Sequence, residues 1–117
     1  MRNYRELEVW RIAIEFVTKI YSITSTFPSS EKYGIVSQIT RASVSISINI
    51  AEGSSRKTAN DFARFLEISV GSCFEVETLL IISMNLKFIE ENKGKELIQE
   101  IQILQKRINA LRTSILK

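Results

Sequence analysis

Hydrophobic residues recur every three or four positions along most of this chain, as on the buried face of an amphipathic helix. The first run comprises Val9, Ala13, Phe16, Ile20, Ile23 and Phe27. Pro28, the one proline of the sequence, follows this run and disfavours helical geometry at the preceding residue. The pattern predicts a helix that ends at a loop over residues 26–30, with Ser30 as the N-cap of the next helix.

The second run has an ambiguous period. Between residues 44 and 50, Val and Ile alternate with Ser and Asn, as in a half-buried strand. A helix fits as well, because Ile35, Ile39, Ala42, Ile46 and Ile50 would form one apolar face, and Val44, Ile48 and Ala51 a second. A lone strand would lack a partner for its backbone groups, so we expect a helix that ends at Gly53. The second apolar face predicts a subunit interface at Val44, Ile48 and Ala51.

Two further helices follow. Thr58 and Asp61 resemble a capping box, and the apolar face behind them comprises Phe62, Leu66, Ser69, Cys73, Val76 and Leu80. We expect this helix to reach about Leu86, and Gly71 with its serine neighbours to form a small patch where another backbone packs closely. After a turn over residues 90–94, the last apolar face comprises Leu97, Ile101, Leu104, Ile108, Leu111 and Ile115. The fold class predicted is all-α, an antiparallel up-and-down four-helix bundle forming a single domain over residues 1–117.

Composition narrows the function. The 117 residues are 44% hydrophobic and 25% charged, which is typical of a globular domain, and the net charge is +3. The sequence has no histidine, which is the usual general base and the commonest metal ligand. We therefore expect that the protein is not an enzyme and that it binds neither a cofactor nor a metal ion. Cys73 is the single cysteine and suits a buried thiol. With no signal peptide and no membrane-spanning run, the expected location is the cytoplasm.

A polar stripe crosses the second helix between its two apolar faces. The stripe comprises Gln38, Arg41, Ser45, Asn49 and Glu52. Three interpretations are open: a solvated face, a buried network of Arg41, Asn49 and Glu52 that sets the packing register, or a ligand site.

Basic residues gather at two places along the chain. Arg56, Lys57 and Arg64 surround the start of the third helix, where the helix dipole adds to the attraction for phosphate. On the last helix, Lys106, Arg107 and Arg112 lie in a stretch without acidic residues. Two interpretations are open. In the first, each basic group is simply part of a solvated helix surface. In the second, all six residues make sequence-independent contacts to the phosphates of a nucleic acid.

Several motifs together resemble a known family. They are Leu7-x-Val9-Trp10-x-x-Ala13, Phe27-Pro28-x-x-Glu31-x-Tyr33-Gly34, Gln38-Ile39-x-Arg41-Ala42-x-x-Ser45-Ile46-x-x-Asn49-Ile50-Ala51-Glu52-Gly53, and Gly71-Ser72 with Glu75-x-Glu77. This combination, from about Tyr4 onward, resembles the four-helix-bundle family of 23S ribosomal RNA intervening-sequence proteins, sometimes labelled ribosomal proteins. The resemblance implies a homopentameric ring without established catalysis. It also favours a structural role for Arg41, Asn49 and Glu52.

A similar protein is the accessory variability protein of diversity-generating retroelements, which binds nucleic acid and a reverse transcriptase. The resemblance therefore implies RNA or DNA, a reverse transcriptase or another protein, and further copies of this chain as partners. Thr40 stands where relatives commonly carry a second arginine, which removes one positive charge per subunit. Two functions follow as hypotheses: a nucleic-acid-binding accessory oligomer, or a protein-docking scaffold without a direct nucleic-acid role.

Overall fold

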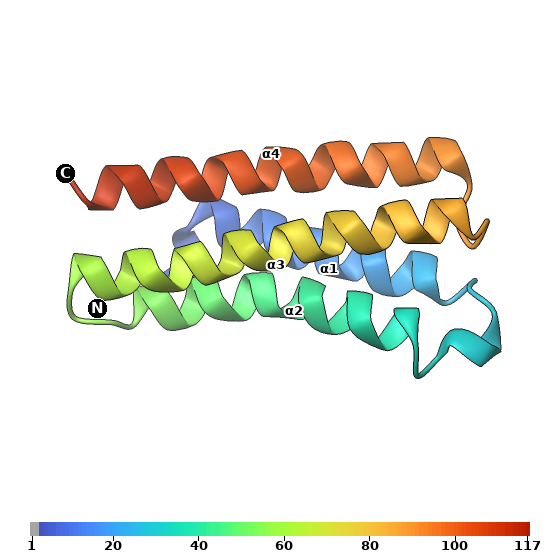
Figure 1. The fold of residues 1–117 in the computed structure, drawn as a ribbon. Helices are drawn as coiled ribbons and strands as arrows, with labels where there is room; N and C mark the ends of the chain where they lie inside the picture. Colours follow the sequence, from blue (N-terminus) through green and yellow to red (C-terminus); the bar gives the residue numbers. More distant parts are fainter. Residues whose placement is uncertain (1–2) are drawn as a thin grey trace.

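Four α-helices pack side by side in the computed structural model, which describes residues 3–117 (Figure 1). The first two residues of the predicted domain lie outside this range. The helices are α1 (Glu8–Thr24), α2 (Ile35–Ser54), α3 (Ala59–Asn85) and α4 (Glu91–Ile115), with short 3-10 helices η1 (Tyr4–Glu6) and η2 (Ser29–Glu31). Each helix packs against the next, and α4 closes the bundle against α1. The predicted all-α four-helix bundle is therefore confirmed.

The core consists of the apolar faces that the helical period predicts. The buried members are Val9, Ala13, Phe16, Ile20 and Phe27, then Ile35, Ile39, Ala42, Ile46 and Ile50, then Phe62, Leu66, Cys73, Val76 and Leu80, and finally Leu97, Ile101, Leu104 and Ile108. Ile23, Leu111 and Ile115 pack against this core while partly exposed. The ambiguous segment over residues 44–50 is helical, as expected, because its backbone groups are satisfied within α2.

Two predicted helix boundaries were wrong by several residues. Ser30 does not cap α2; it lies within η2, and Gly34 precedes the first residue of α2. The turn expected over residues 90–94 is shorter, because α4 begins at Glu91 and includes Gly94. Gly94 is buried against Met84, so a side chain at this position would overlap the methionine sulfur. Close packing against α3, and not a turn, explains this glycine.

The glycines of α2 and α3 also differ from expectation. Gly53 does not end α2, which continues to Ser54; it is buried where α3 crosses closely. Gly71 is exposed and has open space around it, so it does not join a small patch that packs inside the bundle. Its neighbours Ser69 and Ser72 do face α2, through hydrogen bonds. By contrast, the predicted Thr58 cap is present: its Oγ1 accepts a hydrogen bond from the backbone N–H of Asp61 at 3.1 Å.

Candidate nucleic-acid interface

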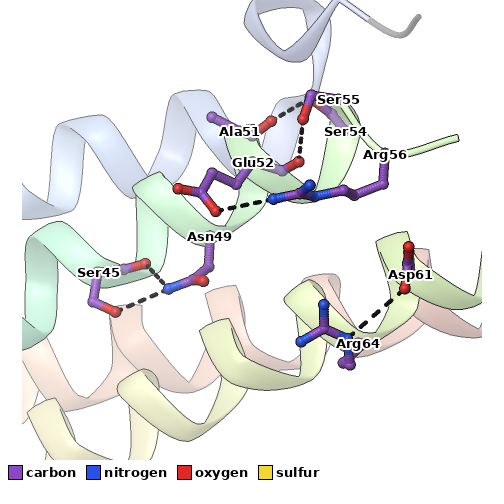
Figure 2. A network of polar contacts seen from close by, with 9 residues as sticks. All are labelled: Ser45, Asn49, Ala51, Glu52, Ser54, Ser55, Arg56, Asp61 and Arg64. Atoms are coloured by element: carbon purple, nitrogen blue, oxygen red, sulfur yellow. Dashed lines mark hydrogen bonds and ion pairs between the residues drawn. The ribbon is translucent and has the colours of Figure 1, made fainter.

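The polar stripe of α2 forms local contacts and one link to α3. Asn49 Nδ2 donates hydrogen bonds to the backbone oxygen of Ser45 at 2.9 Å and to Ser45 Oγ at 3.0 Å (Figure 2). Ser45 Oγ also accepts a hydrogen bond at 3.0 Å from Ser72 on α3. All three side chains are at most half-exposed. Asn49 therefore orients a serine that ties α2 to α3, which suits the structural interpretation of this residue.

The predicted network of Arg41, Asn49 and Glu52 does not form. Arg41 and Glu52 are both exposed, and Glu52 pairs with Arg56 at 3.5 Å (Figure 2). Within residues 3–117, Arg41 has neither a hydrogen bond nor an ion pair. Arg41 lies two turns before Asn49, beyond direct contact along the helix, and Glu52 finds a cation one turn away instead. Each member of the stripe is thus bonded locally or faces solvent.

Two arginine side chains lie against one aromatic ring beside the α2–α3 connection. The guanidinium carbons of Arg56 and Arg64 each lie 4.7 Å from the ring centre of buried Phe65. Arg64 also lies 3.9 Å from the Asp61 carboxylate, and the Glu52 carboxylate approaches Arg56 (Figure 2). Cation–π contact and ion pairing together hold both guanidinium groups at the surface beside this ring.

The basic residues of α4 reach neighbouring helices. Arg107 pairs with Glu8 of α1, and Arg112 with Glu67 of α3 at 3.5 Å. Arg112 is only partly exposed, and its Nε is buried without a hydrogen-bond partner among the described residues. Lys106 is exposed on the same helix, and Lys57 is exposed in the α2–α3 connection.

The fold gathers all six predicted nucleic-acid-binding residues at one end of the bundle. The α2–α3 connection and the carboxyl-terminal half of α4 lie at this end, together with the start of α1 (Figure 1). Arg56, Arg64, Arg107 and Arg112 each hold a carboxylate there. Sequence spacing alone missed the long-range partners Glu8 and Glu67, because they come from other helices.

The predicted interface residues of α2 are not covered by this chain. Ile48 is 50% exposed, and Val44 and Ala51 are half-buried beside it. A second group of exposed apolar residues, missed in the sequence, lies on α3. It comprises Ile68, Phe74, Ile81 and Ile82. Their positions off the buried stripe of α3 are the signal that would have revealed them.

Three further features of residues 3–117 concern metal binding, the thiol of Cys73 and membrane insertion. No group of three or more His, Cys, Asp or Glu side chains in this range is placed to hold a metal ion. Burial raises the pKa of the Cys73 thiol to about 12, and the Glu77 carboxylate adds to the shift. None of the helices in the described range is both long and apolar enough to span a bilayer.

Comparison with known proteins supports the four-helix fold and identifies the family. A family model described as 23S rRNA-intervening sequence protein matches residues 5–110. The chain belongs to this family. Among solved structures, a protein of unknown function from the S23 ribosomal protein family of Bacteroides thetaiotaomicron is similar, with a TM-score of 0.83. The two sequences are 21% identical, and the match covers 90% of this chain and 95% of the other, so the likeness concerns the fold. A search of curated protein sequences found no match to this chain. This intervening-sequence protein thus shares its helical-bundle fold with that solved structure.

Proposed function

We propose that this protein is a non-enzymatic homo-oligomer that binds nucleic acid through phosphate contacts at one end of the bundle. The observation that carries the proposal is the charge distribution. Residues 3–11, 52–67 and 106–117, which the Glu8–Arg107 and Glu67–Arg112 pairs bring together, contain nine Lys and Arg against five Asp and Glu. The remaining described residues contain six against eight. In an oligomer, each copy repeats the basic end, and phosphate binding grows with the number of contacts.

Salt-dependent binding tests the nucleic-acid part. Labelled single-stranded RNA, single-stranded DNA and duplex DNA are titrated with protein over a salt series. We expect an affinity that falls steeply with salt, because each phosphate contact releases counterions. Absence of binding at low ionic strength, or binding that salt leaves unchanged, would exclude the proposal.

A pair of matched double variants locates the interface. Lys57→Glu with Lys106→Glu changes exposed cations at the basic end, and Lys32→Glu with Lys95→Glu makes the same charge change at the opposite end. We expect the first double variant to lose at least about tenfold in affinity, roughly 1.4 kcal/mol, with the second close to the parent. Equal losses in both would indicate a response to net charge alone.

A docking scaffold is the second candidate function. It is favoured by the ion pairing of Arg56, Arg64, Arg107 and Arg112, since a guanidinium that already holds a carboxylate is less available to phosphate. In this case the ring would present repeated surfaces to a partner protein, and multivalency would provide the affinity. A purified oligomer that ignores nucleic acid but retains one specific protein from its source cell would support the scaffold.

Light scattering on a size-exclusion column tests the assembly common to both functions. We expect a mass several times the 13.4 kDa of one chain, and five copies if the family resemblance holds. A mass of one chain at both low and high concentration would overturn the oligomer.

A further inference from the structure

Two guanidinium groups share one aromatic ring near the start of α3. The guanidinium carbons of Arg56 and Arg64 both lie over the Phe65 ring, 4.7 Å from its centre. The phenylalanine is buried, with an exposed fraction of 8%. Both arginine side chains remain accessible, because 43% of Arg56 and 59% of Arg64 is exposed. One side of each guanidinium group therefore faces the ring, while part of each side chain faces solvent.

The packing of α2 against α3 holds this ring in place. Gly53 of α2 lies directly against Phe65, with no room for a side chain between them. A fixed ring restricts the arginine side chains that lie over it. Side chains that are already ordered lose less conformational entropy when they bind a ligand. The two guanidinium groups are therefore arranged for binding before a ligand arrives.

The carboxylates that pair with these arginines approach the N–H groups of the guanidinium (Figure 2). Glu52 lies 3.5 Å from Nη2 of Arg56, and Asp61 lies 3.9 Å from Nε of Arg64. The N–H groups lie in the guanidinium plane and point outward from its edge. Both ion pairs therefore weaken the attraction for a phosphate at the edge, but a carboxylate at the edge does not cover a flat face.

The flat face of a guanidinium group is suited to nucleobases, on which arginine stacks. In a duplex, each base is covered on both sides by its neighbours in the helix. The bases of a single strand can instead unstack and turn outward to meet a protein. Lys57 is exposed in the same connection and offers a cation for the phosphate beside such a base.

We propose that Arg56 and Arg64 stack on unpaired nucleobases, so that the basic end of the bundle binds single-stranded nucleic acid in preference to a duplex. This inference rests on the proposed nucleic-acid binding and names the form of strand that the site takes. Phosphate contacts alone favour the opposite order, because a duplex has the higher density of negative charge. A preference for single strands therefore requires contacts to the bases.

Strand preference is measured with one labelled sequence in several forms. Single-stranded RNA and single-stranded DNA are compared first by fluorescence anisotropy at one fixed salt concentration. The matching duplex and an abasic strand, which has the same phosphates without bases, are then made with the sugar of the better-bound single strand. We expect this single strand to bind at least about tenfold more tightly than its duplex and than its abasic counterpart, because only it offers accessible bases.

A double variant that conserves charge assigns the preference to the two arginines. Arg56→Lys with Arg64→Lys keeps both positive charges but replaces each planar group by a compact ammonium, which cannot stack. We expect at least about fivefold weaker binding of the single strand and unchanged binding of the abasic strand. Arg41→Lys is the matched control, because Arg41 is exposed on α2 roughly 20 Å along the helix axis from Ser54. Circular dichroism checks that each variant is folded.

The outcomes separate this inference from the proposed function. If the abasic strand binds as tightly as the strand with bases, and both respond to salt, stacking is wrong while phosphate binding stands. A preference for the duplex leads to the same conclusion. A double variant that binds like the parent, or that weakens both strands equally, would overturn the assignment to Arg56 and Arg64. If no form of the strand binds at low ionic strength, the inference and the proposed function both fail.

Discussion

Gly53 of α2 and Phe65 of α3 lie so close that a Cβ placed on the glycine would come 2.8 Å from the Phe65 Cβ. Phe62, one turn earlier on α3, would be 2.9 Å away at its Cδ1. Both neighbours are buried, and the crossing brings the ends of the two helices together at the α2–α3 connection. The missing side chain of Gly53 is therefore a requirement of the packing between α2 and α3.

Gly53→Ala should destabilise the protein by about 1–3 kcal/mol, because an added methyl group forces the packed helices apart. Gly71→Ala is the matched control: its position is helical and open, so alanine should raise stability by up to ~1 kcal/mol. Urea unfolding of both variants at one fixed protein concentration would measure the two changes. Equal destabilisation by the two changes would contradict the packing argument.

Ser69→Ala should cost about 0.5–1.5 kcal/mol, because it removes a buried hydrogen bond between helices. Ser69 Oγ donates to the backbone oxygen of Ile46 at 2.7 Å. Ser83→Ala is the control, because Ser83 is equally buried but bonds to Leu79 within its own helix at 2.8 Å. We expect the Ser83 change to cost less in urea unfolding, and the reverse order would count against a special role for the link between α2 and α3.

Thr58→Ala should lower stability by about 0.5–2 kcal/mol through loss of the α3 N-cap. The Thr58 hydroxyl satisfies the Asp61 N–H, which otherwise has no partner within the helix. Thr58→Ser retains the accepting oxygen and should remain close to the parent in thermal unfolding. A serine variant as unstable as the alanine variant would indicate that the threonine methyl group, and not the cap, matters.

Cys73 should resist thiol reagents near pH 8 in the folded protein and react freely once the chain is unfolded. The cause is burial, which raises the thiol pKa from 9.0 to about 12 and keeps the reactive thiolate scarce. Because the folded state holds this proton more tightly, the associated stability is complete below pH 9 and is lost as pH rises towards 12. Cys73→Ala should lack that part of the alkaline loss, and rapid labelling of the native protein would disprove the burial effect.

Predictions from the sequence were confirmed where the residues that determine a feature all lie within one helix. The run from Ile35 to Ile50 and the Thr58 cap depend on residues within one or two turns, and both are confirmed. The prediction that Ser30 caps α2 was wrong, because η2 and Gly34 lie between Ser30 and the start of α2. The position of a serine in the sequence does not indicate that a short 3-10 helix comes first.

In the candidate nucleic-acid interface, by contrast, the decisive contacts join residues from different helices. The clustering of Arg64 and Arg112 at one end follows from the bundle, but their carboxylate partners do not all lie nearby in the sequence. Asp61 is one turn from Arg64, whereas Glu67 reaches Arg112 from a different helix. How much free positive charge remains for phosphate therefore depends on packing.

Helical periodicity alone was enough to assign the four helices, their buried faces and a second apolar face on α2, because burial along a helix repeats every 3.6 residues. The three-dimensional arrangement was needed to separate Gly53, which packs against Phe65, from Gly71, which faces solvent. It also placed Glu8 beside Arg107 and left Phe74 and Ile81 of α3 exposed. These features depend on which helices become neighbours, and local spacing in one dimension contains no information on that choice.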